Sequence, residues 1–418
     1  MSELSYLEKL MDGVEVEWKT LEDITLRTSN IKWREAIRSY RYIDLTSVDI
    51  ATKKIIETTE ITKNNAPSRA QKLVDENDVI FATTRPTQQR FCLIDSEYAG
   101  AVASTGYCIL RAKKDQVLPK WILHWISTSD FKKHVEENQS GSAYPAISDS
   151  KVKECLIPIP CPDNPEKSLA IQSEIVRILD KFTALTAELT AELNMRKKQY
   201  NYYRDQLLSF EDGEVEWKAL GTICQIGDGN HSSKYPKANE MIEQGIPFIR
   251  GTNMVNGTIC NQDMKYISKE KHNELKKGHL KAFDVLIANR GEVGKVAYVP
   301  EGYSGSNLNS QLAWLRANPE IIINRYLFFI LCSSTIQNKL SGEGGALQQL
   351  TIKNIKNIQI PVPSITVQSN IVSFLDKFDS LTNSISEGLP REIELRQKQY
   401  EYYRDLLFSF PKPYTVSN

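Results

Sequence analysis

Apolar side chains recur every three or four positions along residues 171–207. The series comprises Ile171, Ile175, Ile178, Phe182, Leu185, Leu189 and Leu193, and it resumes with Tyr200, Tyr203 and Leu207. This spacing is typical of a helix with one apolar face that is buried or forms a coiled-coil seam. No Gly or Pro follows Pro165 in this stretch. We therefore expect one helix of about 40 residues, roughly 60 Å long at 1.5 Å per residue.

A second helical stretch near the C-terminus contains a helix breaker. The segment SEGLPREI includes Gly388 and Pro390, and it directly follows an apolar series made of Ile371, Phe374, Phe378, Leu381 and Ile385. We expect a kink or break near 388–390 because glycine and proline disrupt a helix interior. The interval from Leu179 to Lys198 is 19 positions, and the matching interval from Leu375 to Lys398 is 23. The difference of four residues is close to one helical turn.

The two helical stretches also share their sequence. MRKKQYNYYRDQLLSF begins at Met195 and LRQKQYEYYRDLLFSF begins at Leu395, with eleven of sixteen positions identical. The likeness extends upstream, where AIQSEIVRILDKFTAL (170–185) matches VQSNIVSFLDKFDSL (367–381). These matches indicate a true internal repeat.

The repeat continues beyond the helices and closes in a circle. The proline pairs IPIP (157–160) and IPVP (360–363) precede the two helices, and VEWKAL (215–220) follows the first copy. VEWKTL (16–21) stands near the start of the chain, after SYLEKLMDG, which resembles the end of a helix copy. The order is therefore helix end, unit, helix, unit, helix.

Alternating apolar and polar segments between the helices predict strands. Three pairs match in the frame of the repeat: YIDLTSVD with FIRGTNMV, NDVIFATTR with FDVLIANRG, and GSAYPAIS with GGALQQLT. Alternation with glycine turns indicates sheet-rich α+β domains. The expected organisation is an N-terminal helical segment 1–11, recognition domain 12–160, spacer helix 164–210, recognition domain 212–362, spacer helix 364–410 and a tail 411–418.

Two similar domains joined by two long helices in circular order predict a pseudo-twofold axis, with the helices antiparallel and the domains at opposite ends. Duplex DNA is a ligand with matching local symmetry, because half-sites about 34 to 36 Å apart face the same side of the duplex. A helix of roughly 60 Å is of the right order to set such a separation.

Composition and charge limit the alternatives. The 418 residues carry 52 Lys plus Arg and 52 Asp plus Glu, so a DNA surface must come from local clustering rather than from net charge. Seven cysteines without a C-x-x-C pair argue against a disulfide framework or a zinc site and favour a reducing cytoplasm. The start of the chain lacks a secretory h-region, and no stretch of eighteen uncharged apolar residues predicts a membrane span.

The whole chain resembles the specificity (HsdS) subunit of type I restriction-modification systems. The helical repeats and NPEKSLAIQSEIV carry this resemblance, and TAELTAEL (186–193) with RKKQYNYYRDQLLSF resembles the type IC branch. The resemblance implies that two target-recognition domains each read half of a split DNA target, with the TAEL number setting the spacer. It also implies docking of two methyltransferase (HsdM) subunits and, through them, restriction and translocation (HsdR) subunits.

The resemblance further implies that this chain binds no cofactor itself. S-adenosylmethionine would belong to the methyltransferase subunits, and ATP and magnesium to the motor subunits. The residues agree, because DNPEK (163–167) departs from the N-P-P-[YF] pattern of amino-methyltransferases and GEVGKV (291–296) departs from a phosphate-binding loop. The five histidines lack metal-ligand spacing. We expect a non-catalytic subunit.

Base reading needs polar side chains on loops that reach base edges. In the second domain, polar clusters near predicted strand ends supply Asn230, His231, Ser232, Lys234, Arg250, Asn253, Asn289, Arg290, Gln348 and Gln349. The first-domain candidates are Arg34, Arg38, Thr46, Thr83, Thr84, Arg85, Gln88, Gln89, Arg90, Ser142 and Tyr144. Because their identities differ at matching places, we expect an asymmetric target. Any one of them is also compatible with an ordinary surface loop.

Two alternatives stay open. The six tyrosines of the two YNYY and YEYY segments are either base-stacking platforms or packing residues at the helix ends, and we favour packing. Lys197, Lys198 and Arg204 are either a solvated face or phosphate contacts. The rival function is a structural tether, in which a coiled coil holds two protein-binding domains without nucleic acid; the zero net charge is its best support.

Overall fold

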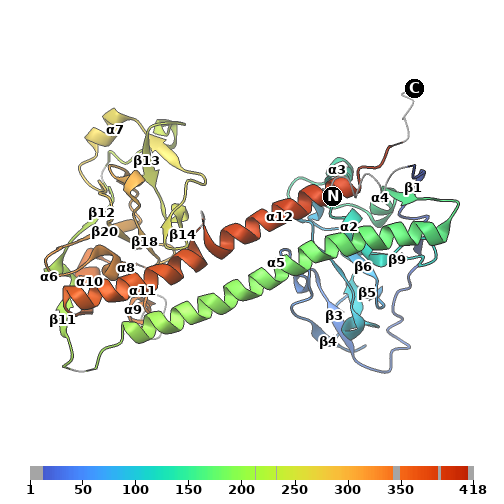
Figure 1. Ribbon diagram of the computed structural model, residues 1–418, viewed down its shortest axis with the longest axis horizontal. Coiled ribbons are helices and arrows are strands. Elements are labelled where there is room, and N and C mark those ends of the chain that lie inside the picture. Colours follow the sequence, from blue (N-terminus) through green and yellow to red (C-terminus); the bar gives the residue numbers. More distant parts are fainter. Residues whose placement is uncertain (1–12, 212, 232, 342–348, 385–386, 413–418) are drawn as a thin grey trace. The chain divides into compact units, whose positions relative to one another are not determined.

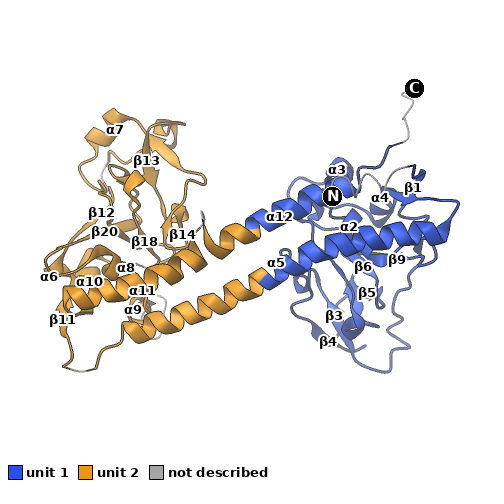
Figure 2. Ribbon diagram, in the orientation of Figure 1, with its two compact units in different colours: residues 1–188, 394–418 blue, residues 189–393 orange. Residues whose placement is uncertain are grey.

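The computed structural model describes residues 13–211, 213–231, 233–341, 349–384 and 387–412 (Figure 1). The chain divides into two compact units, residues 1–188 with 394–418 and residues 189–393 (Figure 2). Two helices contribute to both units: α5 (Pro165–Leu207) and α12 (Gly388–Leu407). Each unit is α+β, as the alternating segments predict.

Unit 1 contains two four-stranded sheets and a two-stranded one. The strand orders are β2-β9-β6-β7, β4-β3-β8-β5 and β1-β10. Their bounds are β1 (Val16–Thr20), β2 (Thr25–Leu26), β3 (Tyr40–Ile43), β4 (Thr59–Ile61), β5 (Ala70–Leu73), β6 (Val79–Ala82), β7 (Phe91–Leu93), β8 (Val102–Ser104), β9 (Tyr107–Ala112) and β10 (Leu156–Pro160). The helices are α2 (Pro119–Trp125), α3 (Ser129–Asn138) and α4 (Asp149–Lys153), with short 3-10 turns at Leu45–Ser47, Pro86–Gln88 and Ser96–Tyr98.

Unit 2 repeats this plan. Its strand orders are β12-β20-β17-β18, β16-β13-β19 and β11-β21, with an added hairpin β14-β15. The bounds are β11 (Glu216–Ala219), β12 (Cys224–Asp228), β13 (Ile246–Ile249), β14 (Met254–Val255), β15 (Thr258–Ile259), β16 (Lys265–Ile267), β17 (Val285–Ala288), β18 (Val296–Tyr298), β19 (Asn307–Leu308), β20 (Leu312–Ala317) and β21 (Gln359–Val362). The helices are α6 (Leu220–Ile223), α7 (Lys269–Glu274), α8 (Asn324–Cys332), α9 (Ser334–Ser341), α10 (Ile352–Asn357) and α11 (Ile365–Asn383).

The register of the strands follows the internal repeat. β3 pairs with β8 in parallel through Tyr42 and Val102, and β13 pairs with β19 in parallel through Phe248 and Asn307. The VEWK segments form β1 and β11, and they pair antiparallel with the proline-containing strands β10 and β21. Proline fits there because both sheets have only two strands, so each strand has an edge that needs no donor.

A glutamine on each spacer helix fixes that helix to its unit. Gln172 accepts a hydrogen bond from the Leu118 backbone N–H at 2.9 Å and donates to the Gln116 carbonyl at 3.0 Å. Gln368 does the same with Ile323 and Ile321, at 2.9 and 3.0 Å. Both glutamines are fully buried, so the satisfied amides hold helix and unit in one arrangement.

Each unit is completed by the repeat copy that comes from the other half of the sequence. Tyr400, Leu407 and Phe408 of the second copy lie in the core of unit 1. Tyr200 and Leu208 of the first copy lie in the core of unit 2. The circular order expected from the sequence is thus present in the packing of each unit.

Candidate functional site

In unit 2, several sequence-predicted residues meet where β17 ends. Asn289 and Arg290 follow the strand, and the Leu350 N–H donates to the Asn289 carbonyl at 2.9 Å. Arg290 forms a β-bridge with Gln349. The Asn289 N–H donates to the carbonyl of Gln311 at 2.9 Å. The strand end and the segment before α10 therefore form one backbone-linked junction.

Unit 1 has the same junction where β6 ends. The Ile147 N–H donates to the Thr83 carbonyl at 2.9 Å, and the Thr83 N–H donates to the Gly106 carbonyl at 2.8 Å. Thr84 forms a β-bridge with Ala146. We call residues 83–85 with 144–147, and residues 289–291 with 349–350, the strand-end junctions. The two units have the same backbone pairing at this place, while the side chains differ.

An exposed arginine stands at each junction and contacts the facing segment. The Arg290 Nε and Nη2 donate to the side-chain oxygen of Gln349, at 3.3 and 3.0 Å, once the Gln349 amide is oriented with its oxygen toward the guanidinium. The Arg85 guanidinium lies over the Tyr144 ring, 5.3 Å from its centre. The Arg85 N–H donates to the Pro145 carbonyl at 2.7 Å. A cation–π contact holds Arg85 and hydrogen bonds hold Arg290, each at the strand-end junction of its unit.

The backbone at Arg85 is unusual for an arginine. It has φ 50° and ψ 53°, in the left-handed region. The matching position of unit 2 is Gly291, with φ 76°. Glycine enters this region without steric cost, whereas other residues there cost on the order of 1 kcal/mol or more.

Some first-domain candidates serve the fold instead of the surface. The buried Thr83 hydroxyl donates to the Gly106 carbonyl at 2.9 Å. Arg90 donates from Nη1 to the carbonyls of Leu45 and Val48. Gln89 has a buried amide that makes no hydrogen bond among the described residues. The remaining members stay on the surface: Arg34, Thr46, Gln88 and Ser142 are exposed, and Thr84 is half-buried.

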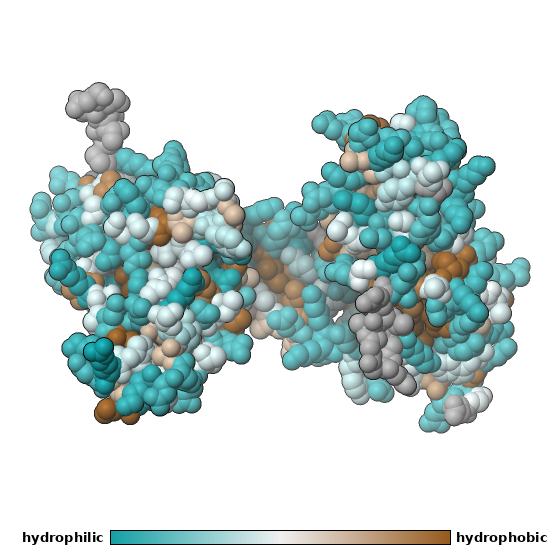
Figure 3. All heavy atoms as spheres, turned by 180° about the vertical axis from the view of Figure 1, so that it is seen from behind, coloured by the Kyte–Doolittle hydropathy of each residue, from teal (hydrophilic) through white to brown (hydrophobic). Residues whose placement is uncertain are grey.

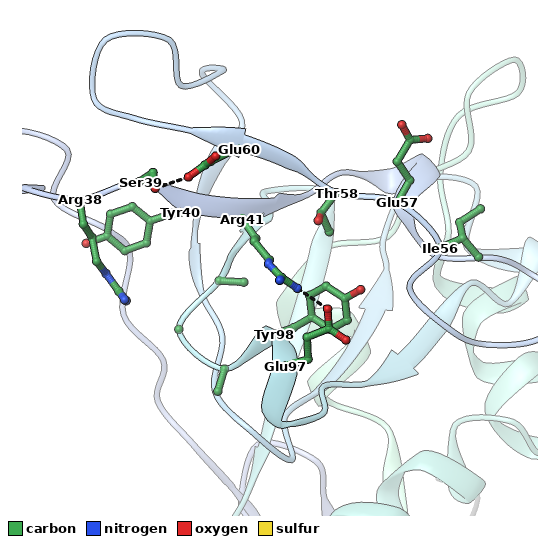
Figure 4. A pocket seen from close by; sticks show the side chains of 13 residues that line it. Arg38, Ser39, Tyr40, Arg41, Ile56, Glu57, Thr58, Glu60, Glu97 and Tyr98 are labelled. Carbon is green, nitrogen blue, oxygen red and sulfur yellow. Dashed lines mark hydrogen bonds and ion pairs between the residues drawn. The ribbon is translucent and has the colours of Figure 1, made fainter.

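Arg38 lies in a hollow of mixed charge, about 690 Å³ in volume (Figure 4). Its guanidinium is 4.7 Å from the centre of the Tyr40 ring. Arg41 shares the hollow and pairs with Glu97 at 2.6 Å. Glu57 and Glu60 add two more carboxylates to the lining. Three carboxylates against two guanidinium groups disfavour a phosphate here, so we leave Arg38 out of the proposed contacts.

In unit 2, Asn253 serves the fold. Its side chain is fully buried, accepts from the Arg250 N–H at 3.1 Å and donates to the Gln262 carbonyl at 3.0 Å. These bonds leave no face for a ligand, and the exposed position expected from the sequence does not exist. The Arg250 guanidinium donates to the carbonyl of Asp263 at 2.5 Å.

The loop at 228–234 gives a mixed result. Asn230 is buried, while His231 and Lys234 are exposed and pair with Asp228 at 3.2 Å and Glu274 at 3.3 Å. Ser232 and Gln348 lie outside the described residues. This loop keeps polar groups at the surface, but acidic neighbours already occupy two of them.

Gln311 lies beside the strand-end junction of unit 2 and was not among the residues predicted from the sequence. Its carbonyl bonds to Asn289, its side chain is exposed, and its N–H donates to the side chain of Asn309 at 3.2 Å. The polar run SNLNSQ before an apolar strand was the available signal. The matching residue of unit 1 is Gly106, which has no side chain, so pairing with the first domain did not point to it.

Packing explains four of the six tyrosines. Tyr200 and Tyr400 are buried, with Arg204 and Arg404 over their rings at 5.6 and 5.5 Å. Tyr203 contacts Phe374 and Phe378, and Tyr403 stacks on Phe182. Tyr202 and Tyr402 are each 62% exposed, at matching positions, and Tyr203 keeps 42% of its surface exposed despite its ring contacts. Of the cations, Lys198 is exposed and Lys197 half-buried.

An aspartate in each repeat copy completes the docking. Asp205 accepts from the Ser334 N–H at 3.0 Å, at the start of α9. Asp405 accepts from the Ser129 N–H at 3.3 Å, at the start of α3. Burial opposes ionisation of Asp205, but the hydrogen bonds from Arg204 and Ser334 outweigh it and lower the pKa of this carboxyl.

Two other features are absent from the described part of the chain. It contains no group of three or more His, Cys, Asp or Glu side chains placed to hold a metal ion. No helix in it has the length and apolar character needed to cross a membrane. On the face drawn in Figure 3, hydrophilic residues predominate over each unit.

Comparison with known proteins gives consistent matches. The family model for the type I restriction modification DNA specificity domain matches residues 14–196 and again 213–395. The chain is 44% identical to the Escherichia coli type I restriction enzyme EcoR124I/EcoR124II specificity subunit, over the full length of both. It is 35% identical to the Escherichia coli EcoprrI specificity subunit, over 93% of each chain.

Solved structures agree at the level of the fold. A chain from a type I restriction-modification assembly matches with a TM-score of 0.62 and 22% identity, over 94% of this chain and 97% of that one. The S subunit from M. genitalium matches with a TM-score of 0.54 and 16% identity, over 96% and 98%.

Proposed function

The chain belongs to the family of type I restriction-modification specificity subunits, and from this we propose that each of its units reads one half of a split, asymmetric DNA target. It is the DNA sequence-recognition subunit of a type I complex and has no catalytic role of its own. Catalysis lies in the methyltransferase and restriction subunits with which specificity subunits act. The type IC branch stays a prediction.

The strand-end junctions are the observation that carries the proposal. Both units present polar side chains on the same backbone frame, Thr84 and Arg85 in one and Arg290 with Gln349 in the other. A shared frame gives both units the same way of meeting DNA, while different side chains select different bases. The asymmetric target follows from this difference.

The reading mechanism is positional. Phosphate contacts set the register of each unit on the duplex, and a few junction side chains test base edges. Two methyltransferase subunits then act on an adenine in each half-site, which they take out of the base stack. S-adenosylmethionine belongs to those subunits, and ATP with magnesium belongs to the restriction subunits joined through them.

The spacer helices set the separation of the two half-sites in this proposal, as an antiparallel pair. α5 runs without interruption through TAELTAEL, at about 1.5 Å per residue. A continuous helix is stiff enough to transmit a change of length from one unit to the other.

The tether alternative explains the helices but not the junctions. A protein-binding tether has no need of arginines at matching strand ends. We place the complex in the cytoplasm, where its DNA lies; all seven cysteines are free, as a reducing compartment requires.

Sequencing of adenine methylation tests this function. The chain is expressed with its methyltransferase subunit in a host that lacks other adenine methylases. We expect a split, asymmetric motif that appears only when this chain is present. If the two proteins co-purify and no motif appears, the recognition function is refuted and the tether gains support.

A further inference from the structure

Each unit holds one arginine in a position that the fold does not require. Arg85 and Arg290 are exposed, and each contacts a side chain of the facing segment rather than a carboxylate. By contrast, Arg111 and Arg316 are bound to the buried Asp78 and Asp284 and belong to the cores. The junction arginines are held in place but keep donors available.

Backbone strain separates the role of Arg85 from folding. A left-handed residue is needed at this turn in both units, and unit 2 meets the need with Gly291. Unit 1 keeps an arginine there despite the steric cost. Strain of this kind clusters at functional sites, and it marks Arg85 as a candidate for one.

The donors left on Arg290 match one particular base. A guanidinium has five N–H donors. Among the described residues, Gln349 accepts one hydrogen from Nε and one from Nη2, which leaves both Nη1 hydrogens and one Nη2 hydrogen. One Nη1 and one Nη2 hydrogen point in parallel and fit the O6 and N7 acceptors of guanine in the major groove, the commonest specific contact of arginine with DNA.

Arg85 also keeps N–H donors available for a base, but a different contact holds its side chain. The centre of the Tyr144 ring lies 5.3 Å from the guanidinium carbon and attracts the cation. This contact uses none of the N–H donors of the guanidinium. Among the described residues this side chain makes no hydrogen bond, so its donors remain available to a base.

We propose that Arg85 and Arg290 each contact a guanine, one in each half-site, and that Tyr144 and Gln349 are positioning residues for them. This rests on the proposed function and names the side chains that carry it out. Arg85 lies one position later in the shared frame than Arg290, since Thr84 matches Arg290. The two guanidinium groups therefore start from different backbone positions and reach different base pairs of their half-sites.

The test begins with the target motif obtained from methylation sequencing of the unchanged chain. Affinity of the complex of chain and methyltransferase is then measured for duplexes in which each base pair of the target is replaced in turn. Arg85→Gly is expected to lose about tenfold to a hundredfold discrimination at one guanine of one half-site. Arg290→Ala is expected to do the same in the other half-site. Each half-site is the control for the other.

The positioning residues have their own variants. Tyr144→Ala is expected to weaken discrimination at the guanine that Arg85→Gly affects, while Tyr144→Phe keeps it because the ring remains. Gln349→Ala is expected to weaken discrimination at the guanine read by Arg290. A residue that only supports the fold would lower affinity for all duplexes alike.

Thermal unfolding controls for folding. Arg85→Gly is expected to be at least as stable as the unchanged chain, because glycine relieves the left-handed strain. If that variant fails to assemble, Arg290→Ala, which lies outside the strained position, still decides the proposal.

Two results would overturn the inference. Affinity that falls evenly across all duplexes identifies phosphate contacts instead of base contacts. Loss of discrimination at a base other than guanine refutes the assigned contact. In both cases the motif of the unchanged chain still stands, so the recognition function survives while the assignment of the arginines does not.

Discussion

At the scale of single residues, an arginine and a buried aspartate fix the strand that leads to each junction. Arg316 donates from Nε and Nη2 to Asp284 at 2.8 and 2.7 Å, and Asp284 is fully buried. Arg111 and Asp78 repeat this geometry with the same distances. Each aspartate directly precedes the strand whose far end carries the junction arginine. The pair therefore holds the register of the strand that leads to the junction arginine, for which we propose a base contact.

Removing the arginine from one pair is expected to be costly. Arg316→Ala leaves Asp284 buried without its cation, which destabilises unit 2 by about 3 to 5 kcal/mol. Denaturant unfolding, followed by hydrogen exchange in the strands of each unit, measures the loss and locates it. The control is Lys295→Ala, which breaks the exposed pair with Glu292 and is expected to cost under about 1 kcal/mol. Equal effects of the two variants would contradict this account.

At the scale of elements, the helix copies close the cores of the units. Phe408 packs on Trp121 and Trp125, with ring centres 4.4 and 5.4 Å apart. Leu208 takes the same repeat position in the core of unit 2. Since eleven repeat positions are identical, the sequence alone indicated two equivalent docking elements.

This equivalence gives a matched pair of variants. Phe408→Ala is expected to destabilise unit 1 by about 3 to 5 kcal/mol, and Leu208→Ala to destabilise unit 2 by about 2 to 5 kcal/mol, because each opens a cavity in a core. Hydrogen exchange of the full chain should show faster exchange in β1 and β10 for the first variant. The second should affect β11 and β21 instead. Faster exchange in both units from either variant would contradict the account in which each helix copy stabilises the core of one unit alone.

The helix break shows what the sequence could predict at the scale of an element. Gly388 and Pro390 predicted a kink or break near 388–390, because glycine and proline disrupt a helix interior. α11 ends at Asn383 and α12 begins at Gly388, so the predicted break is confirmed. Residues 385 and 386 lie outside the described residues.

Periodicity and repetition predicted the α+β units, the long helix and polar residues at matching strand ends, because burial repeats with the geometry of each element. They did not predict which polar side chains face inward. Asn253, Thr83 and Arg90 bond to backbone groups that only the folded loops bring near. The strain at Arg85 was also invisible, because the backbone angle depends on the turn between β6 and β7. The hydrogen-bond partners of loop side chains lie far away in the sequence, so local sequence patterns do not reveal them.

At the scale of the whole molecule, the proposed function makes the number of TAEL units set the length of the DNA spacer. Within α5, Leu189 and Leu193 are half-buried while Ala187 and Ala191 are exposed. Four residues make about 1.1 turns, so one TAEL fewer turns the following helix by only about 40°. The apolar face keeps nearly the same direction, and the docking of Tyr200 and Leu208 in unit 2 is retained.

Deletion of residues 190–193 is therefore expected to change the spacer of the target and nothing else. The helix shortens by about 6 Å, which corresponds to one or two base-pair steps. Methylation sequencing should return both half-sites unchanged, with fewer bases between them. Thr190→Ala, which alters the same segment without changing its length, should leave the motif intact. If the deletion changes a half-site, the helix contributes to base recognition itself. The proposal that α5 sets only the spacing while the strand-end junctions recognise bases would then be wrong.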